Sequence, residues 1–476
     1  MERHVGSSGP SAAVPGWALG LGSLAIFLAS VSAAVITLAL KPMLADLHGD
    51  TQDLIWVSTA YLIPFASALP LAGKLADAIG HRKVLLWSLA LYMAASAGGA
   101  WVGSIGEVIV TRAAAGVGGA GLMISLAWVT TSWAGPRQGF AVGVWRALLL
   151  AGTVGGPPLG GLLAAEVGWR SVMWIFAPLA LVGLVLAWRF LPEPGRPRGI
   201  AGFDWAGATS TLVGLSALVV ALTLVGTPTT AHKGVLAGPV TWAMWAVVAA
   251  SALVTWASLR RAKSPIVDLH LLRIPRFTSA GAGTLLICVG MFSTMYFVPL
   301  FLQYHQGYSP LGAAAAVLPV TVLALAVGVF GGMIADKAGP VLPSVVGFVL
   351  LGVGFVLLAQ ITPATSYAFT GAALALTGIG MALPLAPTAV VAVTSVPEGS
   401  DGEASGLFNL AHNFGRPLAL AAFGIALVVP KASTFGEVFW FSAIAAALGV
   451  LASLGLRPGR APRREARVHS VGVPAK

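Results

Sequence analysis

The chain has 476 residues, of which 57% are hydrophobic and only 9% are charged. A soluble globule of this length needs more polar side chains to cover its surface, so the composition excludes one and indicates a lipid bilayer as the solvent. A net charge of +11 would suggest nucleic acid binding in a soluble protein, but here Lys and Arg fall mainly in alternate loops and in the tail. The single cysteine, Cys288, excludes a disulfide framework and a thiol metal site.

Apolar stretches bounded by charges, Pro-Gly turns or short polar loops predict about fourteen membrane-spanning helices, since a helix needs about 20 apolar residues to cross a bilayer. In chain order they cover residues 17–40, 54–73, 84–103, 107–132, 139–164, 170–191, 204–226, 237–258, 277–302, 310–335, 341–361, 367–394, 403–430 and 435–455. The first stretch is too long for a cleaved signal peptide, so we expect it to remain as a span. The predicted fold class is an all-α membrane protein.

The distribution of Lys and Arg predicts that both ends of the chain lie in the cytoplasm. This orientation gathers most basic residues on one side, as the positive-inside rule requires, and it fits an even number of spans. The predicted parts are a cytoplasmic N-terminus (1–16), an N-terminal six-helix bundle (17–191), a linker with two inserted helices (192–258), a C-terminal six-helix bundle (259–455) and a basic cytoplasmic tail (456–476). We expect the tail to be a disordered retention segment or to contact lipid headgroups, and not to bind nucleic acid.

The pattern G-x-x-x-D-x-x-G occurs twice, each time just after a predicted span. The first copy holds Gly73, Asp77, Gly80 and the following Arg82, and the second holds Gly332, Asp336 and Gly339. This spacing is expected of duplicated six-helix halves separated by two inserted helices. Glycine permits a tight turn and an aspartate can cap a helix N-terminus or pair with an arginine, which predicts a conformational latch. The alternative is a helix cap with ordinary cytoplasmic charges.

The fourth and fifth predicted spans carry two further patterns. Arg112 lies inside the fourth span, where a charge is costly unless it faces the bundle interior or water, so it is either a pathway residue or an arginine that snorkels to the outer surface. Small residues recur through the fifth span and would let it approach a partner helix closely, with a proline bend at the contact between the halves. These residues are Gly152, Gly156, Pro157, Gly160 and Gly161.

Polar side chains follow one face of the thirteenth predicted span. Ser405, Asn409, His412, Asn413 and Arg416 recur at helical spacing. Such a stripe cannot face lipid cheaply, so it should line a cavity or meet another polar helix. His412 could exchange protons near neutral pH, and the alternative is a neutral histidine held by Asn409 or by a backbone carbonyl.

Positive charge dominates the predicted translocation pathway. The predicted pathway residues are Arg112, Arg146, Asn409, His412, Asn413 and Arg416. No acidic residue is predicted near the bilayer centre, so the pathway should favour neutral or anionic substrates and oppose lipophilic cations. Arg146 could alternatively snorkel to the inner surface.

Taken together, these motifs resemble those of the major facilitator superfamily. The first G-x-x-x-D-x-x-G copy, which includes Leu75, is similar to that superfamily's loop signature, and the Arg112 segment is similar to its R-x-x-Q-G motif, with Ala115 at the glutamine. The glycines of the fifth span match the G-x-x-x-G-P-x-x-G-G pattern associated with exporters. Over nearly its whole length the chain resembles the fourteen-span drug:proton antiporter branch.

The resemblance implies a monomeric exporter of a drug or antibiotic in a bacterial plasma membrane, with two bundles that rock against each other and a proton as the coupling ion. One position departs from the branch, because Ser32 stands where an aspartate is usual in the first span. If that aspartate takes part in proton coupling, coupling must occur elsewhere or not at all. His412 is then the leading carrier, with Glu107, Asp401 and Glu403 as alternatives.

No P-loop, metal-ligand cluster or nucleophile triad is present, so we expect neither an enzyme nor a cofactor. The predicted function is secondary active efflux of a small organic molecule, with membrane lipid as the surrounding partner. Three alternatives stay open. One is a uniporter or importer of a small metabolite without proton coupling, which Ser32 favours. The others are an exporter of a lipid-like molecule and a membrane scaffold or sensor.

Overall fold

The structure is a computed structural model that describes residues 16–49, 53–133, 137–191, 199–200, 203–226, 239–262, 268–308, 310–397, 399–423 and 432–457. Almost all of the predicted polar N-terminus and basic tail therefore lies outside the described residues. Within those ranges the regular elements are helices, which confirms the all-α prediction.

The N-terminal bundle, as we name it here, consists of α1 (Gly16–Ala34), the 3₁₀ helix η1 (Val35–Leu38), α2 (Leu40–Asp46), α3 (Asp53–Ile79), α4 (His81–Gly99), α5 (Ile105–Leu122), α6 (Ser125–Ser132), α7 (Gln138–Glu166), α8 (Trp169–Trp174) and α9 (Phe176–Phe190). Two helices follow, α10 (Trp205–Gly226) and α11 (Pro239–Arg261). The C-terminal bundle consists of α12 (Leu269–Leu272), α13 (Pro275–Phe292), the π-helix η2 (Ser293–Phe297), α14 (Val298–Gln306), α15 (Pro310–Ala316), α16 (Leu318–Ala338), α17 (Val341–Leu358), α18 (Tyr367–Thr394), α19 (Asp401–Phe423) and α21 (Ala432–Leu454).

Ten helical segments in the described ranges are long and apolar enough to cross a membrane, or eleven if the two parts of α7, which meet at 45°, count as one span. The apolar part of α1 is shorter than these segments, at Leu19–Ala34. Neither α4 nor α19 is among them, since α4 begins with three basic side chains and α19 carries acidic and basic ones. Length and composition thus support ten or eleven spans, and the count of fourteen stays a prediction.

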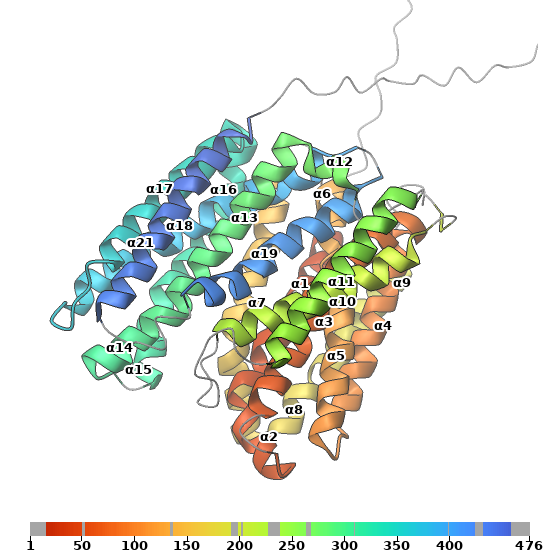
Figure 1. Ribbon diagram of the computed structural model, residues 1–476, viewed down its shortest axis with the longest axis horizontal. Helices are drawn as coiled ribbons and strands as arrows, with labels where there is room; N and C mark the ends of the chain where they lie inside the picture. Colours follow the sequence, from red (N-terminus) through yellow and green to blue (C-terminus); the bar gives the residue numbers. More distant parts are fainter. Residues whose placement is uncertain are drawn as a thin grey trace, which may run out of the picture.

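The two bundles lie side by side, and α7 and α19 run between them (Figure 1). Helix α7 packs on α1 of its own bundle and on α16 of the other, while α19 packs on α13 of its own bundle and on α3 of the other. At one end, α14 and α15 lie far from α2 and α8 (Figure 1). At the opposite end, α6 of the N-terminal bundle touches α18 and α19 of the C-terminal bundle. The molecule is therefore closed at the end with α6.

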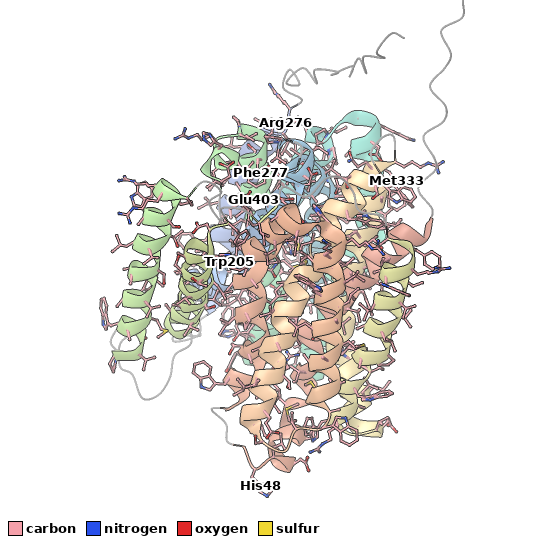
Figure 2. The ribbon with its side chains drawn as sticks, turned by 90° about the vertical axis from the view of Figure 1, so that its right-hand side faces the viewer. His48, Trp205, Arg276, Phe277, Met333 and Glu403 are labelled. Carbon is pink, nitrogen blue, oxygen red and sulfur yellow. The ribbon has the colours of Figure 1, made fainter. Side chains whose placement is uncertain are left out.

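The two helices that follow the N-terminal bundle form a hairpin at the side of the molecule (Figure 2). Helix α10 packs on α11 and also touches both α3 and α19. The Ser216 hydroxyl donates to the Ser67 hydroxyl of α3 at 2.9 Å. Much of α11 is exposed, including the large side chains of Trp242, Leu253 and Trp256, as expected of a helix that faces lipid. The hairpin therefore covers the lateral junction between α3 and α19.

Candidate functional site

Two aspartates connect the bundles at the closed end. Near the end of α3, Asp77 accepts hydrogen bonds from the backbone N–H groups of Gly402 and Glu403, at 2.8 Å each. Near the end of α16, Asp336 accepts from the backbone N–H groups of Gly139 and Phe140, at 2.7 and 3.1 Å. Each aspartate thus caps the first turn of a helix in the other bundle, where unpaired N–H groups and the helix dipole favour a negative charge.

The glycines of the repeated pattern make these contacts sterically feasible. A Cβ on Gly73 would lie 2.3 Å from the carbonyl oxygen of Gly402, and a Cβ on Gly332 would lie 1.9 Å from the carbonyl oxygen of Gly139. Gly80 and Gly339 end the two patterns with φ angles of 107° and 80°, a region that side chains disfavour. The repeat therefore lies at a bundle-to-bundle contact, and its function as a latch stays a prediction.

Arg82 was grouped with the same predicted latch, but its described hydrogen bond lies within the N-terminal bundle. Its Nη2 donates to the carbonyl oxygen of Trp188, near the end of α9, at 2.6 Å. The side chain thus ties α4 to α9. Across the bundles, Asp77 binds backbone N–H groups. These groups belong to the first turn of α19, which packs directly against α3.

A buried ion pair that the sequence did not predict lies beside Asp77. Lys74 Nζ lies 2.9 Å from Glu403 Oε2, and the two side chains are only 8% and 1% exposed. The second carboxylate oxygen of Glu403 accepts from the backbone N–H of Asp268 at 2.5 Å. Figure 2 shows Glu403 inside the molecule near its closed end. Lys74, which directly follows the predicted span 54–73, was the available signal, since a charge at the end of an apolar span needs a partner.

Arg112 turns into the N-terminal bundle. Its Nη1 donates to the backbone carbonyl of Ser32 at 2.8 Å and lies 3.5 Å from the Ser32 hydroxyl, while the guanidinium lies 5.0 Å from the ring centre of Tyr61. The side chain is 2% exposed, so it does not snorkel. The Ser32 carbonyl lies where α1 gives way to η1, a change that alters the hydrogen-bond pattern of the backbone. Arg112 thus pairs with the backbone at Ser32 and not with a carboxylate.

The glycines of the fifth predicted span pack α7 onto α1 and η1. A Cβ on Gly152, Gly156 or Gly160 would meet Ser30, Ala34 or Val35 at 3.0 Å or less. Gly161 is half-buried, and the side chain of Pro157 lies outside the described side chains. The close approach of this stripe is therefore internal to the N-terminal bundle. The two parts of α7 meet at 45° on either side of residues 154–157, and the predicted place of this bend at the contact between the halves stays a prediction.

The polar face of α19 continues from the closed end towards the middle of the molecule. Ser405, Asn409 and His412 are buried, Asn413 is half-buried and Arg416 is exposed. His412 Nδ1 lies 3.1 Å from the Thr284 hydroxyl of α13, and Asn413 Nδ2 donates to the Asn409 carbonyl at 2.8 Å. The stripe thus meets polar atoms of α13 and of its own helix, and its part in a translocation pathway stays a prediction.

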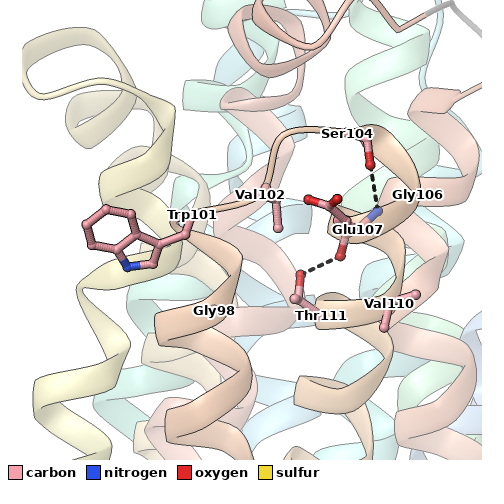
Figure 3. A pocket seen from close by; sticks show the side chains of 8 residues that line it. All are labelled: Gly98, Trp101, Val102, Ser104, Gly106, Glu107, Val110 and Thr111. Carbon is pink, nitrogen blue, oxygen red and sulfur yellow. Dashed lines mark hydrogen bonds between the residues drawn. The ribbon is translucent and has the colours of Figure 1, made fainter.

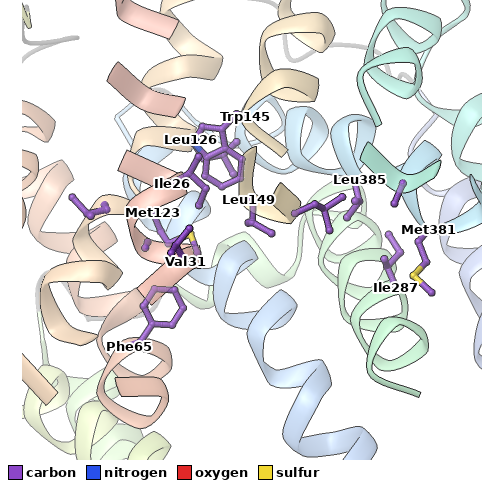
Figure 4. Packing of buried hydrophobic residues seen from close by; sticks show 14 of the residues in the cluster. Ile26, Val31, Phe65, Met123, Leu126, Trp145, Leu149, Ile287, Met381 and Leu385 are labelled. Carbon is purple, nitrogen blue, oxygen red and sulfur yellow. The ribbon is translucent and has the colours of Figure 1, made fainter. Parts of the chain in front are cut away.

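Arg146 reaches this face of α19 from the other bundle. Its guanidinium carbon lies 4.9 Å from the ring centre of Phe408 and 5.1 Å from that of Trp145, and it lies within electrostatic range of His412 and Cys288. The residue is 1% exposed, so it does not snorkel. Figure 4 shows its neighbour Trp145 among buried apolar side chains. Arg146 thus lies between the bundles, in apolar surroundings.

The charge of Arg146 is poorly compensated. Within the part of the chain that the structure describes, none of its three guanidinium nitrogens has a hydrogen-bond partner, and it joins no ion pair. Burying an ion costs several kcal/mol, and cation–π contact returns roughly 2 kcal/mol or more when desolvated. The site is therefore electropositive and lacks an anion.

Arg416 belongs to the same electropositive group. Its guanidinium carbon lies 5.8 Å from the ring centre of Phe292, the residue that directly precedes the π-helix η2. Arg416 and Arg146 are both within electrostatic range of Cys288. The described contacts of Arg112 are with α1 and α3 instead. The structure thus brings Arg146, His412 and Arg416 together. Arg112 was predicted to lie in the same pathway, but its contacts are inside the N-terminal bundle.

A surface pocket lies elsewhere, at the turn between α4 and α5 (Figure 3). Here Glu107 accepts from the backbone N–H of Gly103 at 2.8 Å, and its own N–H donates to the Ser104 hydroxyl at 3.3 Å. These bonds form a cap at the start of α5. Glu107, a predicted alternative proton carrier, is thus a capping residue in this conformation. The described residues contain no group of His, Cys, Asp and Glu side chains that could hold a metal ion.

Comparisons with known proteins bear on both fold and function. Residues 22–420 match the model of a protein family described as "Major Facilitator Superfamily". The chain is 32% identical over 430 residues to the cephamycin export protein CmcT of Amycolatopsis lactamdurans, covering 88% of this chain and 86% of that protein. It is 28% identical over 425 residues to the tetracenomycin C resistance and export protein of Streptomyces glaucescens, covering 88% and 76%. Identity to the multidrug transporter protein MdtP of Bacillus subtilis is 27% over 413 residues, covering 85% and 73%.

Solved structures share the fold at lower identity. The proton:xylose symporter XylE superposes with a TM-score of 0.67 at 16% identity, covering 93% of this chain and 95% of that one. The human organic anion transporter MFSD10 superposes with a TM-score of 0.66 at 14% identity, covering 91% and 98%. These two similarities concern the architecture alone.

Proposed function

The chain belongs to the Major Facilitator Superfamily, a family of membrane transporters rather than enzymes, and from this premise we propose that it exports a small organic molecule from a bacterial cytoplasm by alternating access. The names of its relatives support export, because they include a cephamycin export protein and a tetracenomycin C resistance and export protein. The proposed substrate class is accordingly a drug or an antibiotic.

The observation that carries the proposal is the pair of equivalent caps between the bundles. Asp77 on Gly402 and Asp336 on Gly139 close one end of the molecule, while the helices at the other end lie apart. Both caps consist of hydrogen bonds at a helix terminus, so they can break and re-form as the bundles tilt. We propose that the closed end is cytoplasmic and that this conformation opens outward.

The proposed topology has fourteen spans, with α1, α4 and α19 crossing the bilayer in addition to the eleven segments identified by length and composition. Both termini then lie in the cytoplasm. The basic residues support this orientation, because Arg82, Arg137 and Lys337 lie near the two caps. We further propose that the protein works as a monomer in the plasma membrane.

We propose a proton as the coupling ion. His412 and Glu403 support this, because each is a buried titratable side chain on α19, and Glu403 also pairs with Lys74 across the bundles. Uncoupled transport is the second candidate, favoured by Ser32, which leaves Arg112 without the carboxylate usual in related antiporters. The electropositive group of Arg146, His412 and Arg416 supports a neutral or anionic substrate in either case.

Transport into everted membrane vesicles tests the proposal. Vesicles containing the protein should accumulate at least one compound from a panel of neutral and acidic antibiotics, and a protonophore should collapse the accumulation. Vesicles with the Asp77→Asn/Asp336→Asn double variant serve as the matched control and should accumulate little. Downhill transport that ignores the protonophore would favour the uniporter. Proteoliposomes that move no compound in either direction would contradict transport altogether.

A further inference from the structure

Arg146 is the most deeply buried charged side chain that has no hydrogen-bond or ion-pair partner among the described residues. It is 1% exposed, and its Nε, Nη1 and Nη2 atoms have no hydrogen-bond partner among the described residues. The nearby groups are aromatic or polar: Trp145, Phe408, Cys288 and His412. Because a buried guanidinium requires acceptors, a bound anion would compensate it.

The position of Arg146 relative to the caps gives it a role in closure. It lies seven residues beyond Gly139 on α7, about 10 Å along the helix axis, and Phe408 lies six residues beyond Gly402 on α19, about 9 Å. Both partners of this contact thus stand just inside the caps made by Asp336 and Asp77. In this conformation, with both caps formed, Arg146 lies against Phe408 and is 1% exposed.

The chemistry of the site defines what can pair with it. A guanidinium presents a planar fork of donors that matches a carboxylate, and the rings of Trp145 and Phe408 offer an apolar surface on each side. Asn409 Oδ1 is a buried acceptor without a donor among the described residues, and the Thr284 hydroxyl lies beside His412. A molecule with one carboxylate and an apolar or aromatic body would match the guanidinium and the two rings beside it.

We infer that Arg146 binds the carboxylate of an organic acid with an apolar or aromatic body, and that this pairing is what allows the caps to close behind the substrate. The inference rests on the proposed function, since it names the substrate class and the coupling contact of that pathway. In the empty protein, closure buries an uncompensated cation. With an acid bound, closure buries a neutral pair. The substrate therefore lowers the cost of switching, which is the requirement for coupled transport.

Binding to the purified protein in nanodiscs tests this inference without any ion gradient. The probes are 1-naphthoate and its neutral amide 1-naphthamide, together with two further acid and amide pairs, namely benzoate with benzamide and indole-3-acetate with its amide. The wild type should bind at least one acid ten times more tightly than its amide, by thermal shift and by calorimetry. In Arg146→Gln the ratio should fall to about three or less, and in Arg146→Lys it should be intermediate because the charge stays but the fork is lost.

The matched control is Arg189→Gln, which removes an exposed arginine at the end of α9 and should leave the preference for the acid unchanged. A variant that fails to elute as a single species in size exclusion is replaced by Arg146→Met. A wild type that binds none of the acids better than its amide overturns the inference. A preference that persists in the Arg146→Gln or Arg146→Met variant overturns it as well.

The outcome can be separated from that of the proposed function. Acid binding through Arg146 without accumulation in vesicles would contradict export and leave the site in place. Accumulation of neutral or cationic compounds, with no preference for acids in binding, would leave export in place and overturn the site.

Discussion

The carboxylate of Asp336 and the backbone N–H of Gly139 are 2.7 Å apart, although they belong to different bundles and nearly two hundred residues separate them in the chain. Gly332, one turn before Asp336, lies against the same glycine so closely that a Cβ would stand 1.9 Å from the Gly139 carbonyl oxygen. Gly139 of α7 therefore donates a hydrogen bond to the Asp336 carboxylate and also makes the close backbone contact with Gly332, both on α16. Asp77, Gly73 and Gly402 repeat this arrangement on the other pair of helices.

Gly332→Ala should prevent the closed end from forming, because the added methyl group would collide with backbone that cannot move aside. Export should fall at least tenfold, and spin labels on α7 and α16 should report a longer distance at the closed end. Gly328→Ala, one turn earlier on the same helix, is the matched control, since its Cβ meets nothing within 4 Å. Equal transport by the two variants would contradict the steric argument.

Asp336→Asn should weaken the cap, because the amide offers one acceptor oxygen for two backbone N–H groups and turns its NH2 group towards the other one. A hydrogen bond to a charged group contributes about 1.5–3 kcal/mol and a neutral one about 0.5–1.5 kcal/mol. Since one bond becomes neutral and the other is lost, the closed end should lose at least about 2 kcal/mol, or roughly a factor of 30 in its population. Labelling of a cysteine introduced near the cap in a Cys288→Ser background measures this shift. Asp46→Asn serves as the control, because Asp46 pairs with Arg170 inside the N-terminal bundle. Unchanged labelling in Asp336→Asn would argue against the cap as a latch.

Ser32→Asp should give Arg112 the carboxylate that it lacks. The Ser32 hydroxyl already lies 3.5 Å from Arg112 Nη1, so an aspartate could pair with the guanidinium after a small rotation. Because an uncompensated buried charge becomes a buried pair, we expect the free energy of unfolding to rise by about 1–3 kcal/mol, measured as a higher Tm in nanodiscs. Ser30→Asp, on the same helix and without an arginine among its described hydrogen-bond partners, should lower the Tm. A lower Tm in Ser32→Asp would contradict the assignment of Arg112 as an arginine without a counter-charge.

Lys74 and Glu403 should be energetically dependent on each other. Removing one partner of a buried pair typically costs about 3–5 kcal/mol, since the other charge is left without compensation. Lys74→Met and Glu403→Gln should therefore each lower the Tm, and the double variant should be more stable than the sum of the two effects predicts. A double-mutant cycle on the Tm and on export measures the interaction. Strictly additive effects would show that the pair does not hold the bundles together.

The sequence predicted the elements of the cap but not all of its partners. The spacing of Gly332, Asp336 and Gly339 repeats that of Gly73, Asp77 and Gly80, which was sufficient to infer two halves and a contact between them. The spacing could not reveal that Asp336 and Asp77 accept hydrogen bonds from Gly139 and Gly402, because neither of these two glycines belongs to the repeated pattern. The pairing of Lys74 with Glu403 could not be predicted for the same reason, since each looks isolated within its own helix.

What the sequence alone determined is local: composition and hydrophobic stretches fix the bilayer as solvent and the helix as its element, because in lipid each backbone group must be paired within its own segment. Periodicity likewise placed His412 and Arg416 on one polar face of α19. Only the tertiary structure decided which charges meet. It set Arg146 against Phe408 of the other bundle and turned Arg112 towards Ser32 in its own. Electrostatic energy depends on distances in space, and the separation of two residues along the chain does not specify them.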